Sequence, residues 1–441
     1  MGSSIHVKEA VVVVPSEPTP ARVLQLSAID SQLFLRFTIE YLLVYNPKPG
    51  VDQRATVSRV KTALAKALVP YYPLAGRIRS KPDSSRLEVV CRAQGAVFIE
   101  AVSDRTVSDF HRAPRFVTQW RKLLSFHVAD VLKGSPPIAV QLTWLKDGGV
   151  ALGVGFNHCT CDGIGSAEFL NLFAELATGK RGLTELMKPR PVWDRHLLEP
   201  LPDKRPLNNS YSSPTLPVFN RFPDHCGFVT RFSNERLIPT CNIFETTHLS
   251  ELKKIAMSTN RATESLFTSF EVLSAHIWRS WARALNLPSN QMLKLLFSVN
   301  IRNRVKPSLP GGYYGNGFVL GCAQTSVKDL VDKGLWYASG LVKSAKARVN
   351  DEYVRAVVES VSESKACPDS VGVLILSQWS RLGLERVDFG MGRPVHVGPI
   401  CSDRYCLFLP VYAQRDAVKV LVAVPTSATD KYEYLVNSPY S

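Results

Sequence analysis

The sequence predicts an α/β protein built from two domains. Its 441 residues are enough for two domains of ordinary size, each with its own hydrophobic core. Segments with the alternating apolar pattern of strands are interspersed with segments at helical spacing. Residues 188–223 carry many prolines and little periodicity, and the stretch is too long for an ordinary loop. We therefore expect an N-terminal domain at 1–187, a crossover loop at 188–223 and a C-terminal domain at 224–441.

The first half begins with a strand and a helix and continues with two hairpins. Ile5–Val14 is typical of a strand, and Val57–Ala67 has the apolar face of a helix that ends at Pro70. Glycine-containing links indicate two hairpins, which join 87–91 to 96–100 and 138–145 to 149–156. A helix then runs to about Gly179.

The second half again mixes strands and helices. Its expected strands lie near 243–249, 293–299 and 371–376. One helix is expected to begin at Ser250, and two more to span 265–284 and 328–349. A closing hairpin joins 404–412 to 418–424. His276, on the second of these helices, is interpreted as a core or capping histidine.

Composition excludes several classes of protein. The nine cysteines are an odd number without a disulfide framework, which favours reduced thiols and the cytoplasm. No stretch approaches the roughly 20 apolar residues of a membrane span. The net charge of +15 raises the question of nucleic acid, but the basic residues form no run, so we expect no nucleic-acid partner.

The segment 153–165 is the strongest candidate for chemistry. A predicted strand ends there, a glycine-rich turn carries His158, and a helix begins. An imidazole on such a rigid turn can act as a general base, although a half-buried histidine satisfied by its neighbours has the same pattern. Cys159, Cys161 and Asp162 are conceivable metal ligands beside it, but their spacing is too tight for the usual zinc sites. We therefore expect no metal.

Two motifs together resemble a known family. His-x-x-x-Asp-Gly at 158–163 is weak alone, but its combination with Asp-Phe-Gly-x-Gly at 388–392 resembles the BAHD family of plant acyl-CoA-dependent acyltransferases. The segments 268–275 and 309–317 resemble its alcohol and hydroxycinnamoyl branch. The segments 71–77, 300–302, 313–316 and 377–379 extend the resemblance over nearly the whole chain. It implies two chloramphenicol-acetyltransferase-like domains of mixed sheets flanked by helices, with a channel between them. A segment near 390–415 is then expected to pack with the N-terminal domain.

The resemblance also implies roles for individual residues. His158 matches the family's catalytic base, while Asp162 turns away from the channel to pair with Arg302. Trp379 and Ser377 are candidates for stabilising the oxyanion. Arg393 is a guess for binding the phosphates of CoA. The resemblance gives the second motif a structural role and no part in the reaction. The residues that match this motif are Asp388, Phe389, Gly390 and Gly392, and Met391 stands where the family usually has Trp.

These roles imply an O-acyltransferase. It would move an acyl group, hydroxycinnamoyl or another, from acyl-CoA as co-substrate to a small-molecule alcohol, as a monomer without a tightly bound cofactor. Two alternatives stay open at this point: a polyamine N-acyltransferase of the same family, for which acidic channel residues are expected, and a non-catalytic relative that assists fatty-acid elongation.

Overall fold

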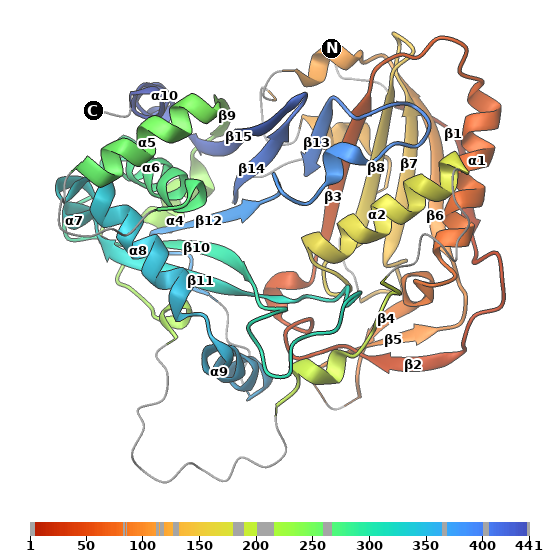
Figure 1. Ribbon diagram of the computed structural model, residues 1–441, viewed down its shortest axis with the longest axis horizontal. Coiled ribbons are helices and arrows are strands. Elements are labelled where there is room, and N and C mark those ends of the chain that lie inside the picture. The colour runs from red at the N-terminus through yellow and green to blue at the C-terminus, as the bar shows by residue number, and fades with distance from the viewer. Residues whose placement is uncertain are drawn as a thin grey trace.

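The computed structural model describes most of the chain. The described residues are 5–82, 84, 86–111, 114, 119–126, 132–179, 189–200, 216–258, 267–363, 368–399 and 405–438. Two six-stranded sheets dominate them, and Figure 1 shows these sheets side by side with helices packed on each. A separate three-stranded sheet lies beside the first of them.

The first large sheet has the strand order β1-β6-β7-β8-β3-β13. The helices α1 (Gln53–Ala67) and α2 (Gly163–Thr178) pack on one of its faces, where Leu64 and Phe169 join one core with Leu152. The strands are β1 (Ile5–Val13), β3 (Thr38–Tyr45), β6 (Ala96–Ser103), β7 (Ile138–Trp144), β8 (Val150–Asn157) and β13 (His396–Pro399).

The strand β13 comes from the far end of the chain. It pairs antiparallel with β3, with Val397 opposite Leu43, so a segment from the second half completes the sheet of the first half. The segment before it is tied down as well, because Tyr45 donates a hydrogen bond to the carbonyl of Val387 and Arg59 to that of Phe389.

The predicted hairpin at 138–156 is confirmed, but the one at 87–100 is wrong. In the confirmed hairpin, Trp144 of β7 lies opposite Val150 of β8. In the other, β5 (Leu87–Cys91) pairs with β2 (Arg22–Gln25) and β4 (Arg77–Ser80), whereas β6 pairs with β1 and β7. The link takes positive φ at Ala93 and Gly95, and a Cβ at Gly95 would lie 2.6 Å from the carbonyl oxygen of Val13. The glycine therefore marks the entry into a second sheet rather than a tight turn.

The second large sheet has the order β11-β10-β12-β14-β15-β9. Its buried face packs against a layer of helices in which Trp278 and Trp281 of α6 are almost completely buried. The strands are β9 (Leu237–Phe244), β10 (Met292–Asn300), β11 (Phe318–Ser326), β12 (Val373–Gln378), β14 (Tyr405–Val411) and β15 (Gln414–Pro425). The helices are α4 (Phe228–Asn234), α5 (Thr246–Ser258), α6 (Ser269–Ala284), α7 (Val327–Asp332), α8 (Gly334–Arg348), α9 (Asp351–Glu363) and α10 (Thr429–Asn437).

Several boundaries in this half differ from the sequence prediction, including those of β12 and β15, and three differences have a clear physical reason. The strand expected at 243–249 ends at Phe244. The residues that follow form α5, because Leu249, Leu252 and Ala256 are buried at helical spacing. The helix expected at 328–349 is broken into α7 and α8, and Gly334 at the break has a φ of 76°. The helix expected from 265 begins at Ser269, where Thr268 and Glu271 form a capping box; 265 itself is outside the described residues.

Part of the predicted crossover can be placed. Val192 forms an isolated parallel bridge with Tyr313, and Val218 packs on Leu296 and Cys322 of the second sheet. Residues 180–188 and 201–215 are outside the described residues, so the domain limits at 187 and 223 stay a prediction. Among the helices that the structure describes, none is both long enough and apolar enough to cross a membrane.

Candidate active site

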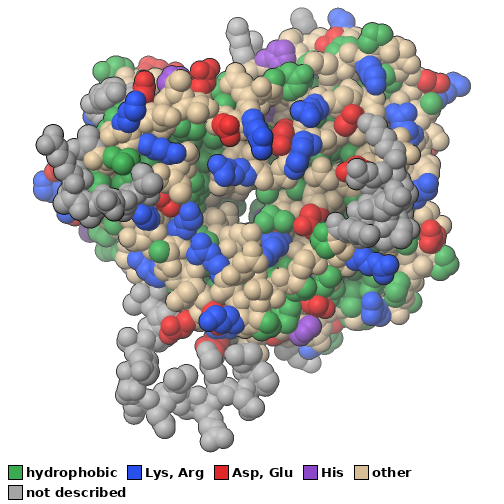
Figure 2. Space-filling model, viewed as in Figure 1, with side chains coloured by type: hydrophobic (Ala, Val, Ile, Leu, Met, Phe, Trp, Pro, Cys, Tyr) green, Lys and Arg blue, Asp and Glu red, His purple; other side chains and the backbone are tan. Residues whose placement is uncertain are grey.

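A cavity of about 1910 Å³ lies between the two large sheets. Residues from β3 and from the turn after β8 line it on one side, and residues from β10, β11, β12 and β14 on the other. Figure 2 shows a hollow near the middle of the molecule's face, with Lys and Arg side chains around it. His158, Asp162, Arg302, Ser377 and Trp379 all contribute to the lining, so the structure brings five of the residues predicted for the site to one cavity.

His158 follows directly after the last residue of β8. Its backbone N–H donates to the carbonyl of Phe37 at 2.9 Å, which holds the turn against the start of β3. The ring lies between Phe37 and Phe318, with centroid separations of 5.3 and 6.0 Å. Burial lowers the pKa of the imidazole from its usual 6.5, partly offset by nearby acidic groups and by a hydrogen bond to Asn316. A neutral imidazole at neutral pH can accept a proton.

Asn316 holds one nitrogen of this ring. Its Oδ1 lies 3.1 Å from His158 Nδ1, which leaves Nε2 as the ring nitrogen without a hydrogen-bond partner among the residues that the structure describes. The sequence drew attention to the loop 313–316 only as a family match. Asn316 in turn contacts the fully buried Asp30, which forms an ion pair with Arg195. Neither Asp30 nor Arg195 is marked by any motif, because only the fold brings these distant segments together.

Asp162 and Arg302 form a two-pronged ion pair. Arg302 Nη1 lies 2.8 Å from Asp162 Oδ2, and Nη2 lies 3.0 Å from Oδ1. The carboxylate also caps α2, accepting from the backbone N–H groups of Ile164 and Gly165. A third backbone donor is Gly317, at 3.0 Å. With its oxygens engaged in this way, Asp162 forms no hydrogen bond with the His158 ring among the described residues, and acts on that ring only through its charge.

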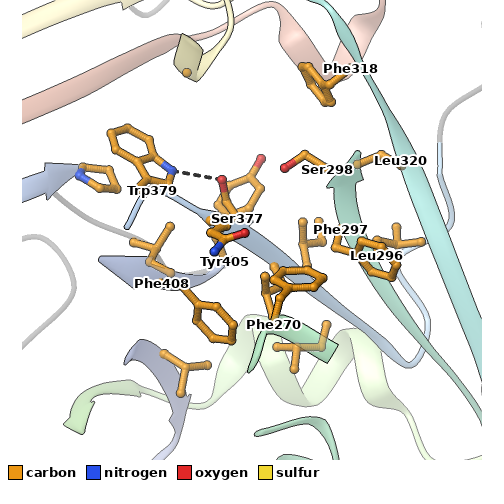
Figure 3. Close-up of a pocket in the computed structure, with 18 of the residues that line it drawn as sticks. Phe270, Leu296, Phe297, Ser298, Phe318, Leu320, Ser377, Trp379, Tyr405 and Phe408 are labelled. Atoms are coloured by element: carbon orange, nitrogen blue, oxygen red, sulfur yellow. Dashed lines mark hydrogen bonds between the residues drawn. The ribbon is translucent and has the colours of Figure 1, made fainter. Parts of the chain in front are cut away.

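Ser377 and Trp379 lie where β12 reaches the cavity. Trp379 Nε1 donates to Ser377 Oγ at 2.9 Å, as the dashed line in Figure 3 shows. The indole is 97% buried and its N–H is used by this bond, whereas the Ser377 hydroxyl keeps its own proton to donate. Of these two side chains, the Ser377 hydroxyl is therefore the one that still has a hydrogen to donate to a ligand.

An apolar pocket opens beside Ser377. Figure 3 shows Phe270 from α6, Phe297 from β10 and Phe408 from β14 facing the same space. Phe270 contacts both other rings edge-on, with centroids 5.6 Å from Phe297 and 6.2 Å from Phe408. Such a pocket can bury an apolar group while a polar group is held at the mouth.

The second motif lies away from this cavity. Asp388 Oδ1 accepts the backbone N–H groups of Gly390 and Gly392, and Phe389 packs on Phe173 of α2. Both glycines have positive φ, which explains the glycine spacing of the motif. Arg393 is exposed and is not among the described residues that line the cavity. The cations that do line it include Lys253, Arg381 and Arg415.

The two cysteines beside His158 are buried. Burial raises the pKa of Cys161 to about 12 and raises that of Cys159 as well, so both thiols are protonated and unreactive at neutral pH. Within the described part of the chain, no group of three or more His, Cys, Asp or Glu side chains is arranged to hold a metal ion.

Comparison with known proteins agrees with the geometry. The model of the family described as "Transferase family" matches residues 3–434. Taxadien-5-alpha-ol O-acetyltransferase of Taxus chinensis is 34% identical, over 97% of this chain and 95% of that protein. The 3'-N-debenzoyl-2'-deoxytaxol N-benzoyltransferase of Taxus canadensis is 32% identical, over 97% and 95%.

Two solved structures share the fold. Vinorine synthase matches with a TM-score of 0.76 and 21% identity, covering 99% of this chain and 98% of that one. TRI101 of F. sporotrichioides, complexed with coenzyme A and T-2, matches with a TM-score of 0.73 and 17% identity, covering 94% and 97%. The expectation of two domains with the chloramphenicol-acetyltransferase-like fold is confirmed by these matches.

Proposed function

Because the chain belongs to the BAHD family of acyltransferases and is therefore an acyl-CoA-dependent acyltransferase, we propose that its acceptor is an alcohol and its general base is His158. The observation that carries the proposal is the placement of His158: its ring reaches the cavity from a rigid turn, Nδ1 is held by Asn316, and Nε2 is left for a substrate. A general base needs such a positioned nitrogen with a pKa near or below neutrality.

The reaction needs one proton acceptor and one oxyanion donor. His158 Nε2 takes the proton of the acceptor hydroxyl as its oxygen attacks the thioester carbonyl. The Ser377 hydroxyl, oriented by Trp379, donates to the oxyanion of the tetrahedral intermediate. When the carbon–sulfur bond breaks, the imidazolium returns its proton to the CoA thiolate, which gives an ester and free CoA. No covalent enzyme intermediate is required.

The cavity also suggests where the donor lies. The acyl group would occupy the apolar pocket beside Ser377, whose aromatic walls suit a hydroxycinnamoyl, benzoyl or aliphatic group. The phosphates of CoA would meet Lys253, Arg381 or Arg415 rather than Arg393, because these three line the cavity. The residues of the second motif and the Asp162–Arg302 pair would then stabilise the fold and take no part in the reaction.

An amine acceptor is the second candidate. It is supported by the N-benzoyltransferase relative and by Glu40, an acidic residue on the cavity wall. Burial raises the pKa of Glu40 to about 7, and Arg121 lies 2.7 Å from its carboxylate. A carboxylate already neutralised by arginine is a poor partner for an ammonium group, so we favour the alcohol.

An activity screen tests the proposal. Purified protein is offered acetyl-CoA, benzoyl-CoA and feruloyl-CoA, each with panels of alcohols and polyamines, and free CoA and product are measured. We expect ester formation, and we expect His158→Ala to bind CoA but form product at least ~100-fold more slowly. His6→Ala, at an exposed position, is the matched control.

The same screen separates the alternatives. Amide products only would favour the N-acyltransferase, and no turnover with any pair would favour a non-catalytic role. Size-exclusion chromatography and a fluorescent fusion would test the expected monomer and the expected cytoplasmic location.

A further inference from the structure

We infer that Asp30 is a positioning residue: through Asn316 it fixes His158 in the tautomer whose bare Nε2 can accept the proton of the acceptor. The inference rests on the proposed function, because it assigns the group that prepares the proposed base. It uses two buried charges, Asp30 and Arg195, that the proposed mechanism leaves without a role.

The hydrogen bonds of Asn316 determine which way its amide points. Asn316 Nδ2 lies 2.7 Å from Asp30 Oδ1 and 2.8 Å from the backbone carbonyl oxygen of His158. A carboxylate and a carbonyl can only accept, so both hydrogens of the amide nitrogen are used there. The amide oxygen must then face His158 Nδ1, at 3.1 Å. Since that oxygen can only accept, Nδ1 carries the hydrogen and Nε2 carries the lone pair.

The orientation depends on Asp30 being an acceptor only. The Asp30 side chain is fully buried, and hydrogen-bond donors surround it. Ser27 donates from its hydroxyl at 2.8 Å and from its backbone N–H at 3.0 Å, and the backbone N–H of Asn316 adds a third bond at 3.1 Å. Arg195 Nη1 balances the charge at 3.2 Å.

Arg195 connects the same network to the turn that carries the base. Its side chain is 98% buried, and Nη2 donates to the carbonyl of Thr160 at 2.7 Å. Its guanidinium also lies 4.3 Å from the ring centre of Trp193. Three segments thus meet behind His158: the loop before β3 with Asp30, the segment 189–200 with Arg195, and the loop before β11 with Asn316.

The charge of Asp30 also acts on the protonated ring. Burial lowers the pKa of His158, while Asp162, the Asn316 hydrogen bond and Asp30 oppose that shift. Loss of the Asp30 charge should therefore lower this pKa further and move the acidic limb of the rate profile to lower pH. The other ionisable groups near the ring or its network include Arg36, Cys159, Cys161, Arg195, Glu199, Arg302, Tyr313 and Tyr314.

The decisive variant is Asp30→Asn, which keeps the size of the side chain. An amide at position 30 can turn its N–H groups toward Asn316 Nδ2, which leaves the backbone carbonyl of His158 to hold this nitrogen alone. When Asn316 rotates, its N–H groups face His158 Nδ1. That geometry puts the hydrogen on Nε2, where the ring cannot act as a base. We expect kcat to fall at least ~30-fold, short of the ~10⁴-fold seen where the orienting carboxylate touches the ring directly. The KM for acyl-CoA should change less than about threefold, because no contact to the cavity is lost.

A second variant is needed to separate the effect on catalysis from the effect on stability, because Asp30→Asn leaves the buried charge of Arg195 unpaired. The double variant Asp30→Asn/Arg195→Gln leaves no unpaired buried charge and should show the same loss of kcat and the same shift of the acidic limb. Glu88→Gln is the control: Glu88 is buried and paired with Arg79 in the small sheet, and it does not line the cavity. This control should keep its kcat.

The tautomer itself can be read without turnover. In ¹⁵N-histidine-labelled protein, with His158→Gln used to assign the signals, the wild type should show a protonated Nδ1 and a bare Nε2. A proton on Nε2 in the wild type would overturn the inference, even if no variant folds. A folded Asp30 variant with kcat within threefold of wild type and an unmoved acidic limb would overturn it as well. If wild type turns over no acyl-CoA with any acceptor, the proposed function fails, and the NMR result still decides the tautomer.

Discussion

Replacing Arg302 with alanine should destabilise the protein by about 4 kcal/mol. The pair that Arg302 forms with Asp162 is buried, with 13% of the arginine side chain and 6% of the aspartate exposed. Removing one partner of a buried pair usually costs about 3–5 kcal/mol, because the other charge is left unpaired. Backbone N–H groups still reach Asp162, which favours the lower end of that range. However, Arg302 also donates to the carbonyls of Tyr313 and Gly315, which favours the upper end.

The assay is equilibrium unfolding in urea, followed by tryptophan fluorescence. The first unfolding transition of Arg302→Ala should move to a lower urea concentration, with soluble yield reduced. Asp162→Asn/Arg302→Met, which removes both charges and keeps an amide to cap α2, should lose less than half as much stability. Arg386→Ala is the matched surface control, since the side chain is 69% exposed, and should stay within about 0.5 kcal/mol. An Arg302→Ala protein as stable as Arg386→Ala would refute the reasoning.

Three further outcomes concern the reaction. In steady-state kinetics, Ser377→Ala should lower kcat roughly 100-fold with little change in KM. Trp379→Phe should lower kcat less, because the phenyl ring fills the space of the indole but no longer orients the serine hydroxyl; a larger loss in Trp379→Phe than in Ser377→Ala would contradict this. Because burial lowers the pKa of His158 below 6.5, the midpoint of the acidic decline of kcat/KM should lie below pH 6.5, and a midpoint above pH 6.5 would contradict the assignment. Phe270→Ala should enlarge the apolar pocket and favour longer acyl chains over acetyl in competition assays, whereas an unchanged preference would place the acyl group elsewhere.

Local pattern was enough to predict the parts of the site that follow one another in the chain. The turn at His158 and the hairpin before it depend on neighbouring residues, namely an alternating strand, glycines and a helix start. The same reasoning failed at 87–100, where the two strands have suitable patterns but each takes its partner from elsewhere in the chain. Alternation shows that a strand has a buried face, and it does not show which strand lies beside it.

The partners of the proposed general base were missed for a related physical reason. Asp30 and Asn316 are separated by 286 residues, and Arg195 lies between them in the sequence. Asn316 lies in the segment 313–316 that the family resemblance marked without giving it a role, and neither Asp30 nor Arg195 lies in any pattern of the sequence. Only burial, together with the need for buried charges to be paired, identifies them once the fold is known. The Asp162–Arg302 pair was expected only because a family resemblance supplied it.

The contribution of β13 to the first sheet has a consequence for biosynthesis. The growing chain can form most of that sheet soon after Asn157 leaves the ribosome, but β3 keeps an open edge until residues 396–399 are made. An unpaired edge strand recruits other strands, so a nascent or truncated N-terminal half should be prone to aggregate. Expressing the two halves as separate proteins should therefore fail, whereas co-expression could succeed if the β13 segment reaches β3 in time.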